Sequence, residues 1–238
     1  MVCKQCGKDN RPEARFCRFC GAEFVKADSQ TGLICKDSIK AQLDELDQKI
    51  NVARMNAHNG HGPRIELDCM ILGDSGSGKN FLAHVIADKI QAAGLVKMAP
   101  KEVDASDWDT FSGDLDNNLT AIKDGILIIT NAQKLLPTTT ASTLIQLDKL
   151  FYRMRREKDT PIVLLCGAIN DLSDYMDNNK DVARLFGLDF RLEAFDIAGL
   201  SNLAMLLLKE TYGMELAADL PGKLNSHFAW FMRQTDLA

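Results

Sequence analysis

Apolar and polar positions vary along this chain in a way that predicts strands and helices in turn. Nearly continuous apolar runs are typical of buried parallel strands, because both faces of such a strand are covered. Such runs open the segment 65–80 and recur at 125–130 and 161–167, and further short strands are predicted near 101–105 and at 190–192. Apolar residues spaced three and four apart indicate helices at 138–156, 197–212 and 217–233, and earlier at Ile39, Leu43, Leu46 and Ile50. This order predicts an α/β fold whose mostly parallel sheet is covered by helices on both faces.

The first strand runs directly into a glycine-rich turn, in the sequence IELDCMILGDSGSGKN over 65–80. Gly73, Gly78 and Lys79 fit the P-loop pattern G-x-x-x-x-G-K, in which backbone N–H groups surround nucleotide phosphates and the lysine reaches the terminal ones. A ligand-free turn between strand and helix is the alternative. The predicted nucleotide-binding residues are Gly73, Asp74, Ser75, Gly76, Ser77, Gly78, Lys79, Asn80 and Phe81.

The residue after the P-loop lysine departs from that pattern. Ser or Thr usually stands there, and its hydroxyl binds Mg²⁺, whereas this chain has Asn80. A carboxamide oxygen can coordinate a hard cation, but it is longer and reaches a different point. We therefore expect ATP or ADP as the ligand and regard magnesium as doubtful.

Four of the seven cysteines lie near the N-terminus as two Cys-x-x-Cys pairs, Cys3 with Cys6 and Cys17 with Cys20. Four thiolates in a tetrahedron suit Zn²⁺ and leave no open position for water or substrate, so we expect a structural zinc site. Disulfides and a redox Cys-x-x-Cys motif are the alternatives. The segment is locally basic and contains two phenylalanines, which permits nucleic-acid binding, but we favour a protein-docking role.

Composition and charge set further limits. The chain has 238 residues, 46% of them hydrophobic, and a formal net charge of −5, which argues mildly against a nucleic-acid scaffold. No apolar run approaches the roughly 20 residues needed to cross a bilayer, and the N-terminus carries a cysteine motif where a signal sequence would lie. We expect a cytoplasmic protein without a membrane span. The predicted domains are a zinc ribbon (1–24), a linker (25–36), a nucleotide-binding domain (37–195) and a partial helical lid (196–238).

From about Ser38 onward, the chain resembles the AAA+ ATPases of the CbbX, rubisco-activase-like clade. The resemblance rests on GDSGSGKN as Walker A, GILIITNAQKL at the Walker B strand and IVLLCGAIND at the sensor-1 strand. The N-terminal segment resembles the short zinc ribbons of bacterial regulatory proteins. The AAA+ resemblance implies a P-loop sheet with a helical lid, ring-forming subunits and protein partners that the ring remodels.

Several positions depart from the family pattern. Active members end the Walker B run in Asp-Glu, which serve the metal and the attacking water, whereas this run ends in Thr130 and Asn131. Asn170 is the candidate sensor-1 residue, with a routine turn residue as the alternative. Arg184 is the candidate arginine finger, with a solvated or intrasubunit role as the alternative. Trp108 and Phe111 are expected in a loop packed against the domain, although Phe111 lies near the family's pore-loop position.

Three functions follow from these observations. We favour a nucleotide-binding AAA+ protein with impaired hydrolysis, which acts as a regulatory or scaffolding subunit of a protein assembly and uses its zinc ribbon as an adaptor. The second is an active ATPase that obtains missing groups from AAA+ ring neighbours. The third is a nucleic-acid-associated P-loop protein. The stretch from His58 to Pro63 is expected to be a loop.

Overall fold

The structure is a computed structural model, and it describes residues 37–59, 66–136, 141–156, 160–210 and 212–235. The chain divides into two compact units. The unit that contains the sheet spans Cys35–Ala194, and helices α8 and α9 belong to the other unit.

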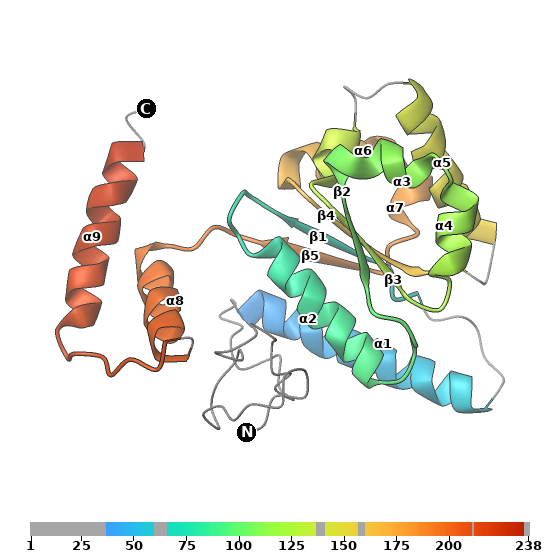
Figure 1. Cartoon of the computed structure of the whole chain (residues 1–238). Coiled ribbons are helices and arrows are strands. Elements are labelled where there is room, and N and C mark those ends of the chain that lie inside the picture. Colours follow the sequence, from blue (N-terminus) through green and yellow to red (C-terminus); the bar gives the residue numbers. More distant parts are fainter. Residues whose placement is uncertain (1–36, 60–65, 137–140, 157–159, 211, 236–238) are drawn as a thin grey trace, which may run out of the picture. The chain divides into compact units, whose positions relative to one another are not determined.

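A single parallel sheet forms the centre of the first unit (Figure 1). Its strands are β1 (Cys69–Gly73), β2 (Lys101–Asp104), β3 (Ile126–Thr130), β4 (Ile162–Gly167) and β5 (Leu188–Leu192), in the order β2-β3-β4-β1-β5. Every residue of β1 and β3 is buried, as the apolar runs predict. The α/β prediction is therefore confirmed, and Cys69 in β1 and Cys166 in β4 are buried free thiols.

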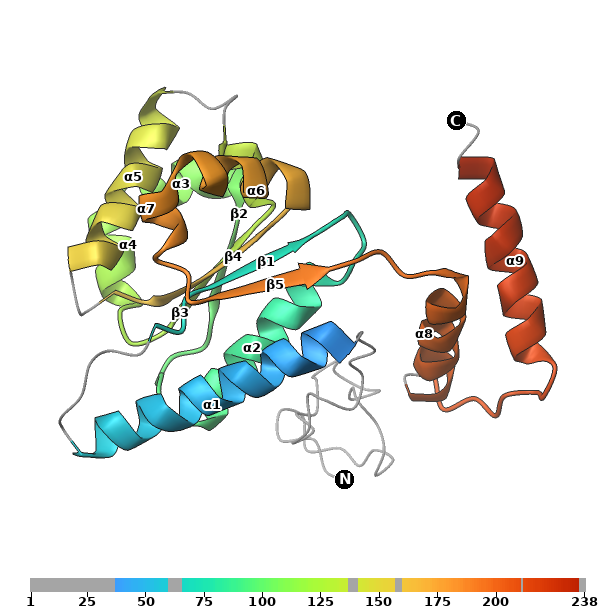
Figure 2. The same ribbon diagram turned by 180° about the vertical axis from the view of Figure 1, so that it is seen from behind.

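Helices cover both faces of the sheet (Figures 1 and 2). One face carries α1 (Asp37–Asn59) and α2 (Lys79–Ala92). The other carries α3 (Trp108–Ser112), α4 (Leu115–Ala121), α5 (Ala141–Arg156), α6 (Ile169–Asn178) and α7 (Lys180–Ala183). Helix α1 is fixed to the end of the sheet through Lys49, whose Nζ donates to the carbonyl oxygen of Gly187 at 2.6 Å.

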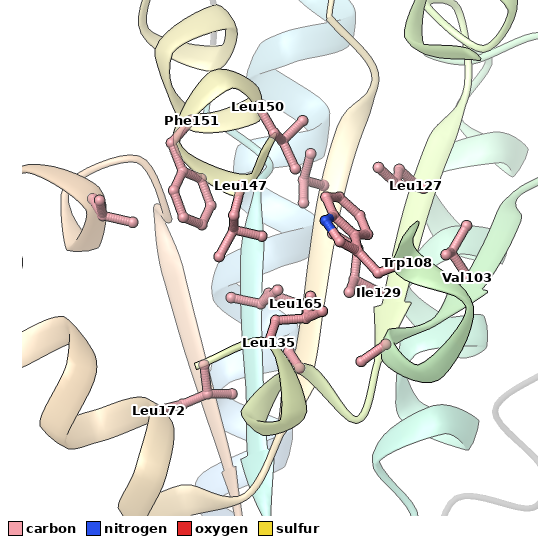
Figure 3. Packing of buried hydrophobic residues seen from close by; sticks show 14 of the residues in the cluster. Val103, Trp108, Leu127, Ile129, Leu135, Leu147, Leu150, Phe151, Leu165 and Leu172 are labelled. Carbon is pink, nitrogen blue, oxygen red and sulfur yellow. The ribbon is translucent and has the colours of Figure 1, made fainter. Parts of the chain in front are cut away.

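The main hydrophobic core lies between the sheet and the helices of the second face (Figure 3). Trp108 and Phe111 are both buried in it, with ring centroids 5.6 Å apart. They belong to helix α3, so the prediction of a loop was wrong in secondary structure although right in packing. Helix α3 is only five residues long, which is too short for apolar periodicity to be visible in the sequence.

A second difference concerns the end of α1. The helix extends to Asn59, so His58 is helical and not part of the expected loop; residues 60–65 lie outside the described part of the chain. The N-terminal cysteines also lie outside it. The apolar stripe predicted for this helix lies within α1, and its residues Ile39, Leu43 and Leu46 are all buried.

The second unit contains α8 (Ile197–Glu210) and α9 (Leu220–Thr235), close to the two helices expected there. These helices contact each other, and the Ser201 hydroxyl donates to the Asn225 carbonyl oxygen Oδ1 at 2.5 Å. Across the described ranges, no helix has the length and apolar content required to traverse a bilayer.

Candidate nucleotide-binding site

The P-loop occupies the carboxyl end of β1, where the strand ends at Gly73 and α2 begins at Lys79. Gly76 and Gly78 have φ angles of 77° and 88°, in the left-handed region that side chains rarely adopt. Gly73 is required for a different reason, because a Cβ there would lie 2.6 Å from Ser77 Oγ and 2.7 Å from the Leu192 carbonyl oxygen. The glycines therefore fix both the loop's conformation and its close packing.

A cavity of about 510 Å³ lies against this loop. It brings together all of the predicted nucleotide-binding residues except Ser77, which is buried with a hydroxyl that has no hydrogen-bond partner. Its lining residues are Gly73, Asp74, Ser75, Gly76, Gly78, Lys79, Asn80, Phe81, Asn131, Gln133 and Ala168. The cavity lies at the carboxyl ends of the parallel strands, which is where ligands bind in open α/β sheets.

Lys79 is held within the loop. Its Nζ donates to the carbonyl oxygens of Gly73 and Asp74, at 2.8 Å and 2.6 Å. Burial lowers the pKa of this amine from its ordinary value, while the nearby Cys166 and Asp74 oppose that shift. The ammonium group lies at the N-terminus of α2, where backbone N–H groups and the helix dipole also favour an anion.

The wall that faces the P-loop is built from amides. Asn131 follows β3 with a φ of 54°, the one positive value among the non-glycine residues that the structure describes. The Oε1 atom of Gln133 accepts a hydrogen bond from the Ala168 backbone N–H at 3.1 Å, which leaves the Gln133 amide nitrogen as a donor beside the cavity. Gln133 was not predicted from the sequence, although its position three residues after Thr130, the end of β3, could have indicated a site residue.

Asp104, the last residue of β2, bonds to Asn131 of this wall without lining the cavity, and it was not predicted from the sequence either. Its Oδ2 accepts from Thr130 Oγ1 at 3.2 Å and from Asn131 Nδ2 at 2.5 Å. Its Oδ1 accepts from the Ser106 backbone N–H at 2.8 Å. That backbone bond and the side-chain bonds lower the pKa of Asp104 to about 2. The parallel register places Asp104 beside Thr130, and this pairing is invisible without the sheet order.

The other predicted catalytic candidates do not line the cavity. Thr130 is buried and its hydroxyl is bonded to Asp104. Asn170 is exposed in the first turn of α6. Arg184 follows α7 with 80% of its side chain exposed and forms a 3.6 Å ion pair with Asp181.

These residues fit a nucleotide better than a nucleotide-bound magnesium ion. The left-handed glycines, the free N-terminus of α2 and Lys79 form a cradle for phosphates. For magnesium, the fit is poor: the facing wall has no carboxylate, and Asn80 replaces the usual hydroxyl. Asp74, the one carboxylate in the lining, belongs to the P-loop itself. Among the residues that the structure describes, no group of three or more His, Cys, Asp or Glu residues could hold a metal.

A five-stranded parallel sheet with a P-loop after β1 defines a P-loop α/β fold of the AAA+ ATPase type, as predicted. A solved structure of a RuvB variant from Thermotoga maritima matches it with a TM-score of 0.51 at 19% identity, over 79% of this chain and 55% of that chain. A second RuvB variant gives a TM-score of 0.52 at 18% identity. At sequence identities this low, the structural similarity is evidence for the fold alone.

Two further comparisons concern sequence. Residues 2–24 match the zinc-ribbon domain family, so the chain carries an N-terminal zinc ribbon, and the Cys3, Cys6, Cys17 and Cys20 set falls within it. The secretion system protein EccA3 of ESX-3 is similar: 24% identical over 206 residues in Mycolicibacterium smegmatis and 26% over 181 residues in Mycobacterium tuberculosis. These matches span 83% and 71% of this chain but only 32% and 27% of the relatives.

Proposed function

We propose that this protein binds ATP or ADP through its P-loop, hydrolyses ATP poorly or not at all, and serves as a regulatory or scaffolding subunit of a protein assembly. The observation that carries the proposal is the contrast between the two sides of the cavity. The P-loop side has the glycines, the lysine and the helix N-terminus that phosphates require. The facing side has neutral amides where hydrolysis requires carboxylates for the metal and the attacking water.

The hydrogen bonds of Thr130 support the loss of hydrolysis. In an active site of this class, an aspartate in that place binds magnesium through water. Here the hydroxyl of Thr130 donates to Asp104, away from the cavity lining, so it does not face the phosphates. Asn131 is not a general base, because a neutral carboxamide does not take up a proton near neutral pH.

A protein partner suits both the fold and the relatives. EccA3 is a secretion system protein, and the resemblance to the CbbX clade, which we retain as a hypothesis, implies ring neighbours and remodelled protein partners. In our proposal the zinc ribbon is the adaptor and zinc is structural, the protein is cytoplasmic and oligomeric, and residues 196–238 begin a helical lid. Zinc ribbons with four thiolates leave no open position for catalysis, which fits a docking role.

Binding and turnover of ATP test the proposal on the purified chain. We expect calorimetry to detect nucleotide binding, and Lys79→Ala to weaken it about 30-fold or more, because each charge-assisted bond to phosphate contributes about 1.5–3 kcal/mol. EDTA is expected to weaken it much less than Lys79→Ala does. Lys123→Ala is the matched control, since Lys123 is exposed and precedes β3 at the opposite end of the sheet from the P-loop.

Two results would contradict the proposal. If the unmodified chain binds neither ATP nor ADP, the P-loop is a ligand-free turn. If it shows strong magnesium-dependent ATP hydrolysis that Lys79→Ala abolishes, the protein is an active motor. The exposed Arg184 gives the second reading a specific basis, because an arginine accessible at the surface could serve the site of a neighbouring subunit.

A further inference from the structure

The amide group of Asn131 lies between the nucleotide cavity and the carboxylate of Asp104. Asn131 lines the cavity, and its Nδ2 atom donates to Asp104 Oδ2 at 2.5 Å. A carboxylate can only accept hydrogen bonds, so the nitrogen of the amide must be the atom that faces Asp104. The amide oxygen Oδ1 is then the atom left for the cavity.

Asp104 is itself held in place, so it can fix its neighbour. Its two oxygens accept from the Ser106 backbone N–H at 2.8 Å and from Thr130 Oγ1 at 3.2 Å. The ammonium group of Lys134 lies 4.0 Å from Oδ1, whereas Asn131 bonds to Oδ2. The unusual backbone of Asn131, with φ at 54°, is a conformation that asparagine tolerates better than most residues.

We propose that Asp104 is a positioning residue that turns the amide oxygen of Asn131 toward the bound phosphates, and that the pocket therefore binds a nucleoside diphosphate in preference to a triphosphate. The P-loop and Lys79 supply donors for the phosphates that they surround. On the facing wall Gln133 offers an amide donor, but a further phosphate that extends toward Asn131 meets an acceptor oxygen there, and no proton joins those two groups. This inference rests on the proposed nucleotide-binding function.

The substitution Asp104→Asn tests the positioning directly. The Ser106 backbone N–H cannot turn away, so the new amide keeps its oxygen there and presents its nitrogen to Asn131. Two amide nitrogens cannot bond to each other, and Asn131 turns by half a rotation. Its nitrogen then faces the cavity and donates to the further phosphate.

The measurement is the ratio of the dissociation constants of fluorescent ATP and ADP analogues, in EDTA, on the full-length protein. We expect the wild type to bind ADP more tightly and Asp104→Asn to reduce that preference about threefold to tenfold, the size expected for converting one opposed polar contact into a hydrogen bond. Asp107→Asn is the matched control, because it removes the same charge three residues away and is expected to leave the ratio unchanged. A general loss of structure would weaken both nucleotides and leave their ratio alone.

A second variant covers the case in which Asp104→Asn does not fold. Asn131→Gly removes the acceptor oxygen while glycine keeps the left-handed backbone, so it is also expected to reduce the preference for ADP. Adding Asp104→Asn to Asn131→Gly should change the ratio less than Asp104→Asn alone, because the amide through which it acts is gone. Equal affinity for ATP and ADP in the wild type, or a ratio that neither variant moves, would overturn the inference alone. Absence of any nucleotide binding would overturn the proposed function with it.

Discussion

Replacing Thr130 by aspartate introduces the carboxylate that P-loop NTPases use at this place to hold magnesium, and we expect it to destabilise the protein. The Thr130 hydroxyl oxygen lies 3.2 Å from Asp104 Oδ2. An aspartate at this position places a second carboxylate against the first, in a location where Thr130 is only 2% exposed. The existing charge at Asp104 therefore opposes the introduced one.

The size of the effect follows from that separation. Two unit charges about 4 Å apart repel by about 1 kcal/mol in water and about 4 kcal/mol at the effective dielectric constant typical of protein surfaces. The repulsion raises the folded-state pKa of one carboxyl above its unfolded value. The folded variant then gains a proton as the pH falls through this raised pKa. The loss of stability is therefore present above that pKa and decreases below it.

Urea unfolding of the wild type and the variants provides the assay. We expect Thr130→Asp to lower the free energy of unfolding by about 1–4 kcal/mol at pH 7. Asparagine has nearly the same shape as aspartate without the charge, so Thr130→Asn should lower the free energy of unfolding less. Adding Asp104→Asn to Thr130→Asp should recover most of the loss. If Thr130→Asp and Thr130→Asn are equally stable, or Asp104→Asn gives no recovery, then Asp104 is not a charged neighbour of Thr130.

Two further predictions concern the zinc ribbon and acid stability. Metal analysis of the purified protein should find one zinc per chain, and Cys17→Ser should release it while the sheet-containing unit keeps its unfolding transition; joint loss of both would contradict independent domains. The pKa of Asp104 is lowered from 3.8 to about 2, so its stabilising contribution is present above pH 4 and is lost as the pH falls toward 2. The difference in unfolding free energy between wild type and Asp104→Asn should shrink over that window, and a constant difference would show that the carboxylate is not stabilised on folding.

The fold could be predicted from the sequence because its information is local. Apolar runs mark β1, β3 and β4, and all three strands fall within the predicted ranges. Only β5 begins earlier than expected, at Leu188, since Asp189 and Arg191 interrupt its apolar pattern. The P-loop is also local, because its turn, lysine and helix N-terminus follow one another along the chain.

The facing wall of the site could not be predicted in the same way. Asp104 meets Thr130 and Asn131 across a strand pair, 26 and 27 residues apart in sequence, and only the register of β2 against β3 brings them together. In the same way Gln133, which follows β3, accepts a hydrogen bond from the backbone N–H of Ala168, which follows β4. Sequence spacing alone identifies which carboxylates are missing from the Walker B position, but it does not locate the carboxylate that stands beside it.

The position of Asp104 bears on the impaired hydrolysis that we propose. The negative charge is present at this end of the sheet, one strand further out, where Ser106, Thr130 and Asn131 occupy its oxygens. Because Thr130 and Asn131 are both bonded to it, changing either one to a carboxylate places like charges together and breaks a hydrogen bond. Under the proposed function, hydrolysis would therefore require Asp104 to change together with these residues and with Asn80. Residues in one hydrogen-bond network have non-additive effects, so changing one of them alone does not supply the function of the group. We therefore expect single substitutions at Thr130 or Asn131 to lower stability without producing turnover.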